Sequence, residues 1–317
     1  MFGPYVHHID PIIGTLAGVH LWWYGLSYSL GFLNAYYAFR RRSDLGLTRT
    51  QTLDLAILLS IGVLLGGRLV MVFHSRAFFA EHPTLVPDVW LGGMATHGLL
   101  IGGFAGVLMF CLIHRQPYRV IFDALAIPTA VILACGRIGN FIDGEIVGTV
   151  TALPWGVKFP AAEGFRHPVV LYDGLKNLLI IPALLAVRRR GAPAGHEAAL
   201  FLFLYACLRL FIDLLREYPQ TLIGLPAGQA FNLFFAVAGL ALLVRSHWRK
   251  AEPASPAPRV PVDRATPFAL LWRRCVFVCI VLFALVIPSD GLRDVPKVYG
   301  GRHPGLTYSS LYVPIPR

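Results

Sequence analysis

The stretch ACGRIGNFIDGEIVG, residues 134–148, places charged and amide side chains in an otherwise apolar part of the chain. It holds Arg137, Asn140, Asp143 and Glu145 together with four glycines. Ionisable side chains inside a membrane are expensive unless they are paired or hydrated, so they mark functional sites by default. A guanidinium fork matches phosphate oxygens, and glycines let the backbone approach a ligand closely. The stretch therefore predicts a site for an anionic headgroup.

A second polar group lies in LYACLRLFIDLLREY. Tyr205, Arg209, Asp213 and Arg216 follow one another at i, i+4, i+8 and i+11, which places them on one face of a predicted helix. One interpretation is an Arg–Asp ladder that neutralises itself within the helix. Leucine would serve there without penalty, however, so a polar face turned toward an internal cavity accounts for the pattern better.

Two further polar residues interrupt apolar runs. Arg68 follows LLGG, and His97 lies in GGMATHGLLIGG. A lone histidine in an apolar helix is more often a packed structural residue. His97 is flanked by glycines and belongs to the same set as the arginines, which favours a functional role. The glycines of GLLIGGFAG indicate helix packing and not a nucleotide site, and no metal-ligand spacing, Ser–His–Asp set or P-loop is present.

The composition defines the setting of these residues. The chain has 317 residues, of which 56% are hydrophobic and 14% are charged, whereas soluble domains carry about 25% charged residues. This deficit, with a positive mean hydropathy, predicts an all-α polytopic membrane protein. The formal net charge of +11 is compatible with nucleic-acid binding or with basic residues held in cytoplasmic loops.

Apolar runs long enough to cross a bilayer predict seven membrane-spanning helices and a possible eighth. The seven cover residues 21–39, 53–73, 95–113, 121–138, 168–187, 198–215 and 229–245, and the eighth covers 268–288. Arg273 and Arg274 interrupt the eighth run, so an amphipathic surface helix is its alternative. The junctions at Gly92–Gly93 and Gly136–Gly148 are candidates for non-helical backbone at membrane depth.

The distribution of basic residues orients the predicted spans. Sixteen Lys and Arg residues fall in loops on one side and five in loops on the other. This bias predicts an N-terminus outside the membrane and explains the net charge without nucleic acid. The site residues then converge near the outer leaflet. The sequence predicts three segments. Residues 1–247 form the membrane domain, residues 248–267 a proline-rich cytoplasmic linker, and residues 268–317 an extra helix with a periplasmic tail.

At these residues the chain resembles the bacterial prolipoprotein diacylglyceryl transferases. The family signature G-R-x-G-N-F-x-N-x-E-x-x-G reads GRIGNFIDGEIVG over Gly136–Gly148. Further matching stretches follow in the family order, over about residues 18–247: VHLWWYGLSYSLGF with Tyr24, LLGGRL with Arg68, GGMATHGLLIG with His97, RHPVVLYDGL, YACLRLFIDLLRE, and GLPAGQAFNL.

The resemblance implies a seven-span enzyme of the bacterial inner membrane that needs no cofactor or metal and works as a monomer. Its reaction would move a diacylglyceryl group from phosphatidylglycerol to the lipobox cysteine thiol of a prolipoprotein, forming a thioether and releasing glycerol-1-phosphate. His97 would assist thiolate formation, and Arg137 and Arg209 would hold the phosphate. The remaining site residues would orient these groups or the lipid: Tyr24, Arg68, Asn140, Glu145, Tyr205, Asp213 and Arg216.

Four positions depart from the family pattern. Asp143 stands where Asn is usual, Asp213 replaces Glu, Leu99 replaces the second Gly after His97, and Leu91 replaces an Asp. Residues 248–317 lie outside the pattern. Two other functions therefore stay open: a paralogous membrane transferase with a different acceptor or lipid donor, and a lipid-binding or transport protein without catalytic activity.

Overall fold

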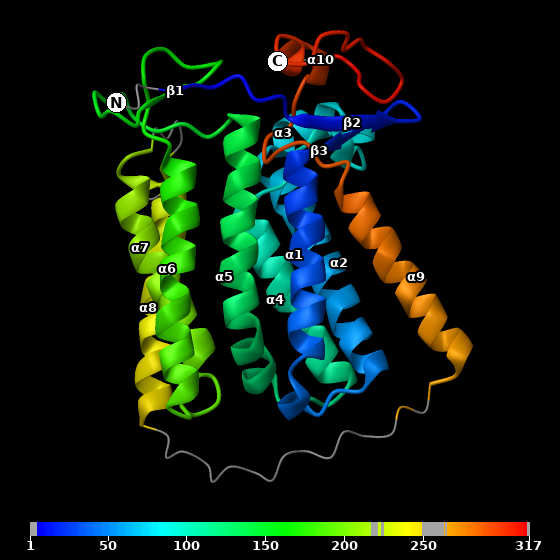
Figure 1. Cartoon of the computed structure of the whole chain (residues 1–317), viewed down its shortest axis with the longest axis vertical. Helices are drawn as coiled ribbons and strands as arrows, with labels where there is room; N and C mark the ends of the chain where they lie inside the picture. The colour runs from blue at the N-terminus through cyan, green and yellow to red at the C-terminus, as the bar shows by residue number, and fades with distance from the viewer. Residues whose placement is uncertain (1–4, 217–220, 223–224, 249–262, 264, 316–317) are drawn as a thin grey trace. The chain divides into compact units, whose positions relative to one another are not determined.

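The computed structural model describes residues 5–216, 221–222, 225–248, 263 and 265–315 (Figure 1). The chain forms two compact units. Unit 1 comprises residues 1–8 and 119–259, and unit 2 comprises residues 9–118 and 260–317. The predicted linker over 248–267 falls almost wholly outside the described residues, and the predicted division into domains stays a prediction.

Unit 1 is built around long helices joined by loops with short strands. Its helices are α5 (Tyr118–Asp143), α6 (Val169–Arg189), α7 (His196–Asp213) and α8 (Ala227–His247). Strand β1 (Tyr5–Val6) pairs in parallel with β4 (Val157–Lys158), and β5 (Thr221–Leu222) pairs antiparallel with β6 (Leu225–Pro226). Helix α7 packs on α6 and α8, which brings its polar face against α6.

Unit 2 combines long helices with a layer of short elements at one end (Figure 1). Its long helices are α1 (Trp23–Arg40), α2 (Arg49–His74), α4 (Thr96–Ile113) and α9 (Pro267–Ala284). The short elements at that end are the antiparallel strands β2 (Ile12–Leu16) and β3 (Val19–Trp22), helices α3 (Arg76–Glu81) and α10 (Val295–Tyr299), and 3₁₀ turns over 83–85 and 89–91. A further 3₁₀ turn over 43–45 follows α1 at the other end.

The prediction of an all-α polytopic membrane protein is confirmed. Six helices of the described chain are long and apolar enough to cross a membrane: α2, α4, α5, α6, α8 and α9. Helices α1 and α7 coincide with predicted spans, but α1 is rich in tyrosine, serine and glycine, and α7 carries Glu197, Arg209 and Asp213. The count of seven or eight spans therefore stays a prediction.

Glycines set the contact between α2 and α4, and the sequence predicted a packing role for those of α4. A methyl group added to Gly102 would collide with the carbonyl oxygen of Gly62 and lie 2.8 Å from Cα of Gly66, and one added to Gly98 would collide with the carbonyl oxygen of Gly66. The backbones of the two helices therefore touch along a small-xxx-small seam. Leu99, one of the departures from the family pattern, packs against Gly67 beside this seam.

Of the two predictions of non-helical backbone at membrane depth, the first is confirmed for the backbone conformation and the second is partly wrong. The depth of both segments in the membrane stays a prediction. Gly92 and Gly93 have φ angles of 87° and 91°, a region that only glycine adopts readily. The predicted break at Gly136–Gly148, in contrast, begins only after Asp143, because α5 continues through the motif. Within this helix Arg137 and Asn140, one turn apart, hydrogen-bond to each other.

Candidate active site

A single buried carboxylate joins three helices of unit 1. Asp173 on α6 is 1% exposed, and its Oδ2 accepts a hydrogen bond of 2.5 Å from Nε of Arg137 on α5. The same oxygen accepts from Nη1 of Arg209 on α7. Nζ of Lys176, one turn further along α6, lies 3.0 Å from Oδ1. Asp173 therefore fixes two guanidinium groups from different helices at one point.

The sequence around Asp173 explains how α5 comes so close. The next residue is Gly174, and a methyl group there would lie 3.2 Å from Cβ of Arg137. A larger side chain at position 174 would push α5 outward. On α5, Nη1 of Arg137 donates to Oδ1 of Asn140 at 2.8 Å, which holds the guanidinium plane toward α6.

The polar face of α7 is shared between two neighbouring helices. Nε of Arg209 lies 2.9 Å from Oδ1 of Asp213, so the intrahelical pair exists. Asp213 also accepts from Nδ2 of Asn232 on α8 at 2.8 Å, and Arg209 reaches Asp173 on α6. The self-neutralising ladder is thus one part of a network that extends across α6, α7 and α8.

Tyr205 extends this network toward α6. Its backbone carbonyl accepts a hydrogen bond of 3.2 Å from Nζ of Lys176, which also lies 3.7 Å from the centre of the Tyr205 ring. Both residues are buried. The amine is therefore held between a carboxylate, a carbonyl and an aromatic face, an arrangement that compensates a buried cation.

Three of the predicted arginines line one narrow pocket, which is too tight to hold a water molecule in this structure. Arg137, Arg209 and Arg216 meet there with the aliphatic side chains of Ile146, Val169, Val170 and Ile212. One detail of the prediction is wrong: α7 ends at Asp213, so Arg216 is not on the helical face. It lies in the following turn, where its backbone pairs with Gly148 of the motif. This bridge connects the end of α7 to the segment after α5.

The two acidic residues of the motif have different positions. Asp143 is the last residue of α5 and is 3% exposed, whereas Glu145 follows in the loop and is half-buried. Asp143, the most notable departure from the family pattern, is thus an interior residue of unit 1. Glu145 lies one residue before Ile146, which lines the pocket.

The remaining predicted site residues belong to unit 2. The hydroxyl of Tyr24, at the start of α1, donates to the carboxylate of Asp290 and lies 3.1 Å from the hydroxyl of Tyr28. His97 is the second residue of α4 and is half-buried. The convergence of Tyr24, Arg68 and His97 with the arginines of unit 1 stays a prediction.

Arg68 has a set of partners in unit 2 that the sequence did not indicate. Its guanidinium donates to the carbonyl oxygens of Leu85, Val86 and Gly92 at 2.5, 2.7 and 2.6 Å. These carbonyls belong to the segment that leads to α4. Arg68 therefore anchors the chain just before His97, and its predicted contact with the lipid stays a prediction.

Several functional candidates escaped the sequence analysis: Asp173, Lys176, Asn232 and Asp290. A signal for the first two was present, because both are ionisable residues inside the predicted span 168–187 and stand three positions apart. Asn232 is an amide in an apolar run and carries little signal. Asp290 lies outside the resemblance, and only the fold brings it to Tyr24.

The fold and the pocket together define a polytopic membrane protein with clustered arginines beside aliphatic side chains. Residues 11–245 match the family model of the prolipoprotein diacylglyceryl transferases, and the chain belongs to this family.

Among its relatives are three phosphatidylglycerol–prolipoprotein diacylglyceryl transferases. That of Geobacter sulfurreducens is 37% identical over 257 residues, covering 78% of this chain and 98% of the relative. That of Chromohalobacter salexigens is 36% identical, with 78% and 96% covered. That of Aliivibrio salmonicida is 34% identical, with 75% and 87% covered.

Proposed function

We propose that this protein transfers the diacylglyceryl group of phosphatidylglycerol to the lipobox cysteine thiol of prolipoproteins, the first step of lipoprotein maturation. The observation that carries this proposal is the pocket of unit 1, where Arg137, Arg209 and Arg216 meet four aliphatic side chains. A phosphodiester headgroup attached to acyl chains has the matching chemistry, because its oxygens take guanidinium donors and its chains take apolar surface.

The reaction proposed here is a substitution at carbon. The thiolate of the lipobox cysteine bonds to the glyceryl carbon that carries the phosphate. The bond from that carbon to the phosphate oxygen breaks, and glycerol-1-phosphate leaves with the electron pair. Arg137 and Arg209 bind the phosphate in the ground state and stabilise the charge that grows on the leaving group. Asp173 sets the spacing of these two guanidinium groups.

The acceptor side needs a base, since a thiol with an ordinary pKa is mostly protonated at neutral pH. His97 is the proposed base and takes the proton of the thiol. Asn140, Glu145, Tyr205 and Asp213 support the arginines or the glycerol headgroup. Tyr24 contacts the substrate. The departure at Asp143 is the position to examine first if the protein prefers another lipid.

The proposed location is the bacterial inner membrane, with the N-terminus outside and the protein active as a monomer. The bias of basic residues supports this orientation. The proposed substrates support the membrane location, because phosphatidylglycerol is a membrane lipid and a signal peptide with its lipobox is an apolar segment.

The test uses purified full-length protein, phosphatidylglycerol vesicles and a lipobox peptide. We expect a thioether-linked diacylglyceryl peptide and glycerol phosphate. Arg137→Ala and Arg209→Ala should each lower kcat/KM by roughly 100-fold or more, since each removes a positive charge that stabilises the leaving group. Arg190→Ala, at an exposed position after α6, is the control and should retain activity.

Each outcome has a separate meaning. Full activity in either pocket variant would contradict the phosphate clamp while leaving the reaction in place. Product formation from another lipid, and none from phosphatidylglycerol, would favour a paralogous transferase. Lipid binding without any covalent product would contradict the proposed reaction and favour a binding or transport role.

A further inference from the structure

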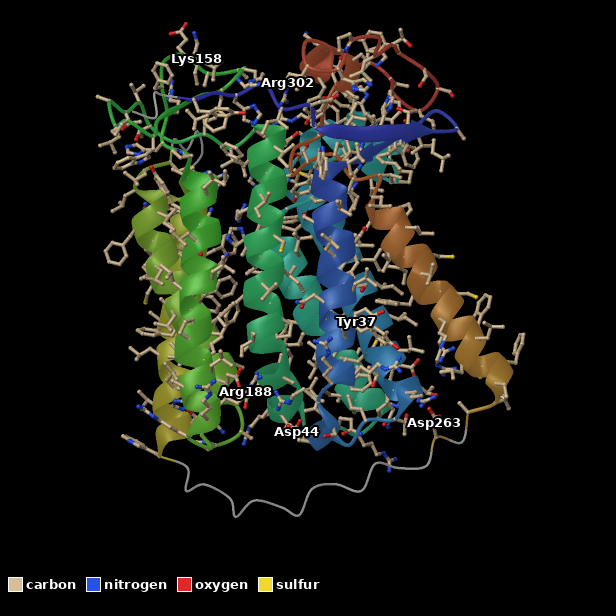
Figure 2. All side chains as sticks on the ribbon, in the orientation of Figure 1. Tyr37, Asp44, Lys158, Arg188, Asp263 and Arg302 are labelled. Carbon is tan, nitrogen blue, oxygen red and sulfur yellow. The ribbon has the colours of Figure 1, made fainter. Side chains whose placement is uncertain are left out.

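The chain continues well beyond the segment that matches the family. The match ends at residue 245, whereas the structure describes residue 263 and residues 265–315 as part of unit 2. We call residues 263–315 the C-terminal extension. It begins at the end of the unit where Asp263 lies and finishes at the opposite end, where Arg302 lies (Figure 2). The extension therefore runs the full length of unit 2.

Backbone hydrogen bonds fix the extension to the family segment of unit 2. The amide of Trp22 donates to the carbonyl of Leu285 at 2.9 Å, and the amide of Arg293 donates to the carbonyl of Leu91 at 2.7 Å. The amide of Met94 donates to the carbonyl of Asp290 at 2.8 Å. These bonds place residues 285–293 between the start of α1 and the segment that precedes α4.

Two glycines of the family segment make room for this contact. A methyl group on Gly25 would lie 2.6 Å from the carbonyl carbon of Leu285, and one on Gly92 would lie 3.1 Å from Oγ of Ser289. Both added methyl groups would also collide with backbone oxygens of the extension. The extension is therefore packed backbone to backbone on two positions adjacent to predicted site residues.

The outer part of the extension shares a hydrophobic core with the family segment. Trp22, Leu91, Val295, Tyr299 and Tyr312 are buried together at this end of the unit. The ring nitrogen of Trp90 donates to the carbonyl of Leu311 at 2.8 Å, and the hydroxyl of Tyr312 accepts from the amide of His20 at 2.8 Å. These contacts order residues 285–315 against the family segment and leave Asp290 at a fixed position.

Asp290 contacts both the start of α1 and the segment that precedes α4. Its backbone carbonyl binds the amide of Met94, three residues before His97. Its carboxylate accepts the hydroxyl proton of Tyr24, a residue that is 4% exposed. One residue of the extension thus connects the tyrosine of the W-Y-G element to the chain that carries the histidine.

We propose that Asp290 is a positioning residue for the transferase reaction, which acts by orienting the hydroxyl of Tyr24. This proposal rests on the proposed function, because Tyr24 is assigned a substrate contact there. With its proton donated to Asp290, the Tyr24 oxygen presents lone pairs. One lone pair faces the hydroxyl of Tyr28 at 3.1 Å. The other accepts a hydrogen bond from an O–H or S–H group of the substrate, to which Tyr24 does not donate. A residue of the extension, outside the family match, thereby sets whether the hydroxyl of Tyr24, inside the match, donates or accepts a hydrogen bond.

The experiment compares Asp290→Asn with Asp294→Asn in the full-length protein. Asp294 lies four residues further along the extension, where it caps α10 and accepts from the amide of Lys297. It is therefore the control for a general effect on the extension. We expect Asp290→Asn to lower kcat by about tenfold, as the loss of a charge-assisted hydrogen bond does, with a smaller change in KM for phosphatidylglycerol. Asp294→Asn should keep kcat within about twofold.

Three further measurements make the test specific to positioning. Tyr24→Phe combined with Asp290→Asn should lose no more activity than Tyr24→Phe alone, because the two residues act through one hydrogen bond. Asp290→Glu, which retains the carboxylate, should recover part of kcat. In protein with ¹³Cζ-labelled tyrosine, the Tyr24 resonance should move in Asp290→Asn and stay in place in Asp294→Asn.

Several results would overturn the proposal. The first is a wild-type kcat in Asp290→Asn or in Tyr24→Phe. The second is a loss of kcat in the double variant that equals the sum of the two single losses in free energy. The third is an equal loss of kcat in Asp290→Asn and Asp294→Asn. Tyr24→Phe removes the same hydrogen bond from the other side, so wild-type kcat in this variant would overturn the proposal even if Asp290→Asn fails to fold. An inactive wild-type protein would contradict the proposed function and this positioning role together. The resonance shift would then show whether the hydrogen bond itself exists.

Discussion

At the scale of single residues, the arginines of the GRIGNF motif and of α7 depend on a carboxylate that is not part of either motif. Arg137 and Arg209 both bind Oδ2 of Asp173, and Lys176 binds its other oxygen. An unpaired guanidinium buried away from water would be unstable. Asp173 therefore compensates the charge of the two guanidinium groups and holds them in place, as the proposed anion site requires.

Replacing Asp173 by Asn should destabilise the protein and reduce transfer together. The change leaves the shape but removes the charge that two buried guanidinium groups share, a loss of roughly 3–5 kcal/mol in comparable networks. We expect a lower midpoint of thermal unfolding in detergent and at least a tenfold loss of kcat/KM.

The control for this prediction is Asp44→Asn. Asp44 pairs with Arg42 at 2.6 Å, but its side chain is 57% exposed, and exposed pairs contribute about 0–1 kcal/mol. Its unfolding midpoint should match that of the wild type. Equal midpoints for Asp173→Asn and Asp44→Asn would show that Asp173 does not hold the arginines.

At the scale of elements, the glycine spacing predicts contacts better than it predicts breaks. The glycines of α4 do pack on those of α2, because a four-residue repeat of small side chains lets two helices approach at the backbone. The glycines of the GRIGNF motif lie within α5, which continues to Asp143. Glycine permits a break without requiring one, and the surrounding residues decide.

Alanine substitutions test the difference between a glycine at a helix–helix contact and a glycine without such a contact. Gly102→Ala should destabilise the protein by about 1–3 kcal/mol, since its methyl group would collide with the backbone of Gly62. Gly136→Ala on α5 is the matched variant, because in the described part of the chain the added methyl group would meet no atom within 4 Å apart from its chain neighbours and the nearby backbone of α5.

We expect Gly136→Ala to be neutral or to stabilise by up to about 1 kcal/mol, the helix-propensity difference between alanine and glycine. Thermal unfolding in detergent measures both variants. A Gly102→Ala protein as stable as Gly136→Ala would show that the helices do not touch at this position.

At the scale of the whole molecule, each unit has two ends that face opposite sides of the membrane in the predicted topology. In unit 1, Lys158 lies at one end and Arg188 at the other (Figure 2). In unit 2, Arg302 lies at one end and Asp44 at the other (Figure 2). The bias of basic residues predicts that the ends with Lys158 and Arg302 are outside.

Thiol labelling of intact cells tests this orientation. A membrane-impermeant maleimide should react with Lys158→Cys and Ser310→Cys before lysis, and with Asp44→Cys and Arg190→Cys only after lysis. All four positions are exposed. The unsubstituted chain is the control, since its five cysteines lie within α4, α5, α7 and α9. The reverse labelling pattern would contradict the predicted orientation.

The sequence by itself determined the class of fold, the approximate helix boundaries and most members of the arginine pocket. These features depend on local information: the length of apolar runs, the spacing of polar residues along a helix, and the rarity of charge in a membrane. Arg137, Arg209 and Arg216 were all identified in this way, although Arg216 proved to lie beyond the end of α7.

Only the tertiary structure decided how these residues are paired. The decisive contacts join different helices or segments of the chain. They are the contacts of Asp173 with Arg137 and Arg209, of Asn232 with Asp213, and of Asp290 with Tyr24. A carboxylate in an apolar run signals that a partner exists but not which residue it is. That choice depends on which helix faces pack together, and the fold sets it through close approaches such as those at Gly174 and Gly25.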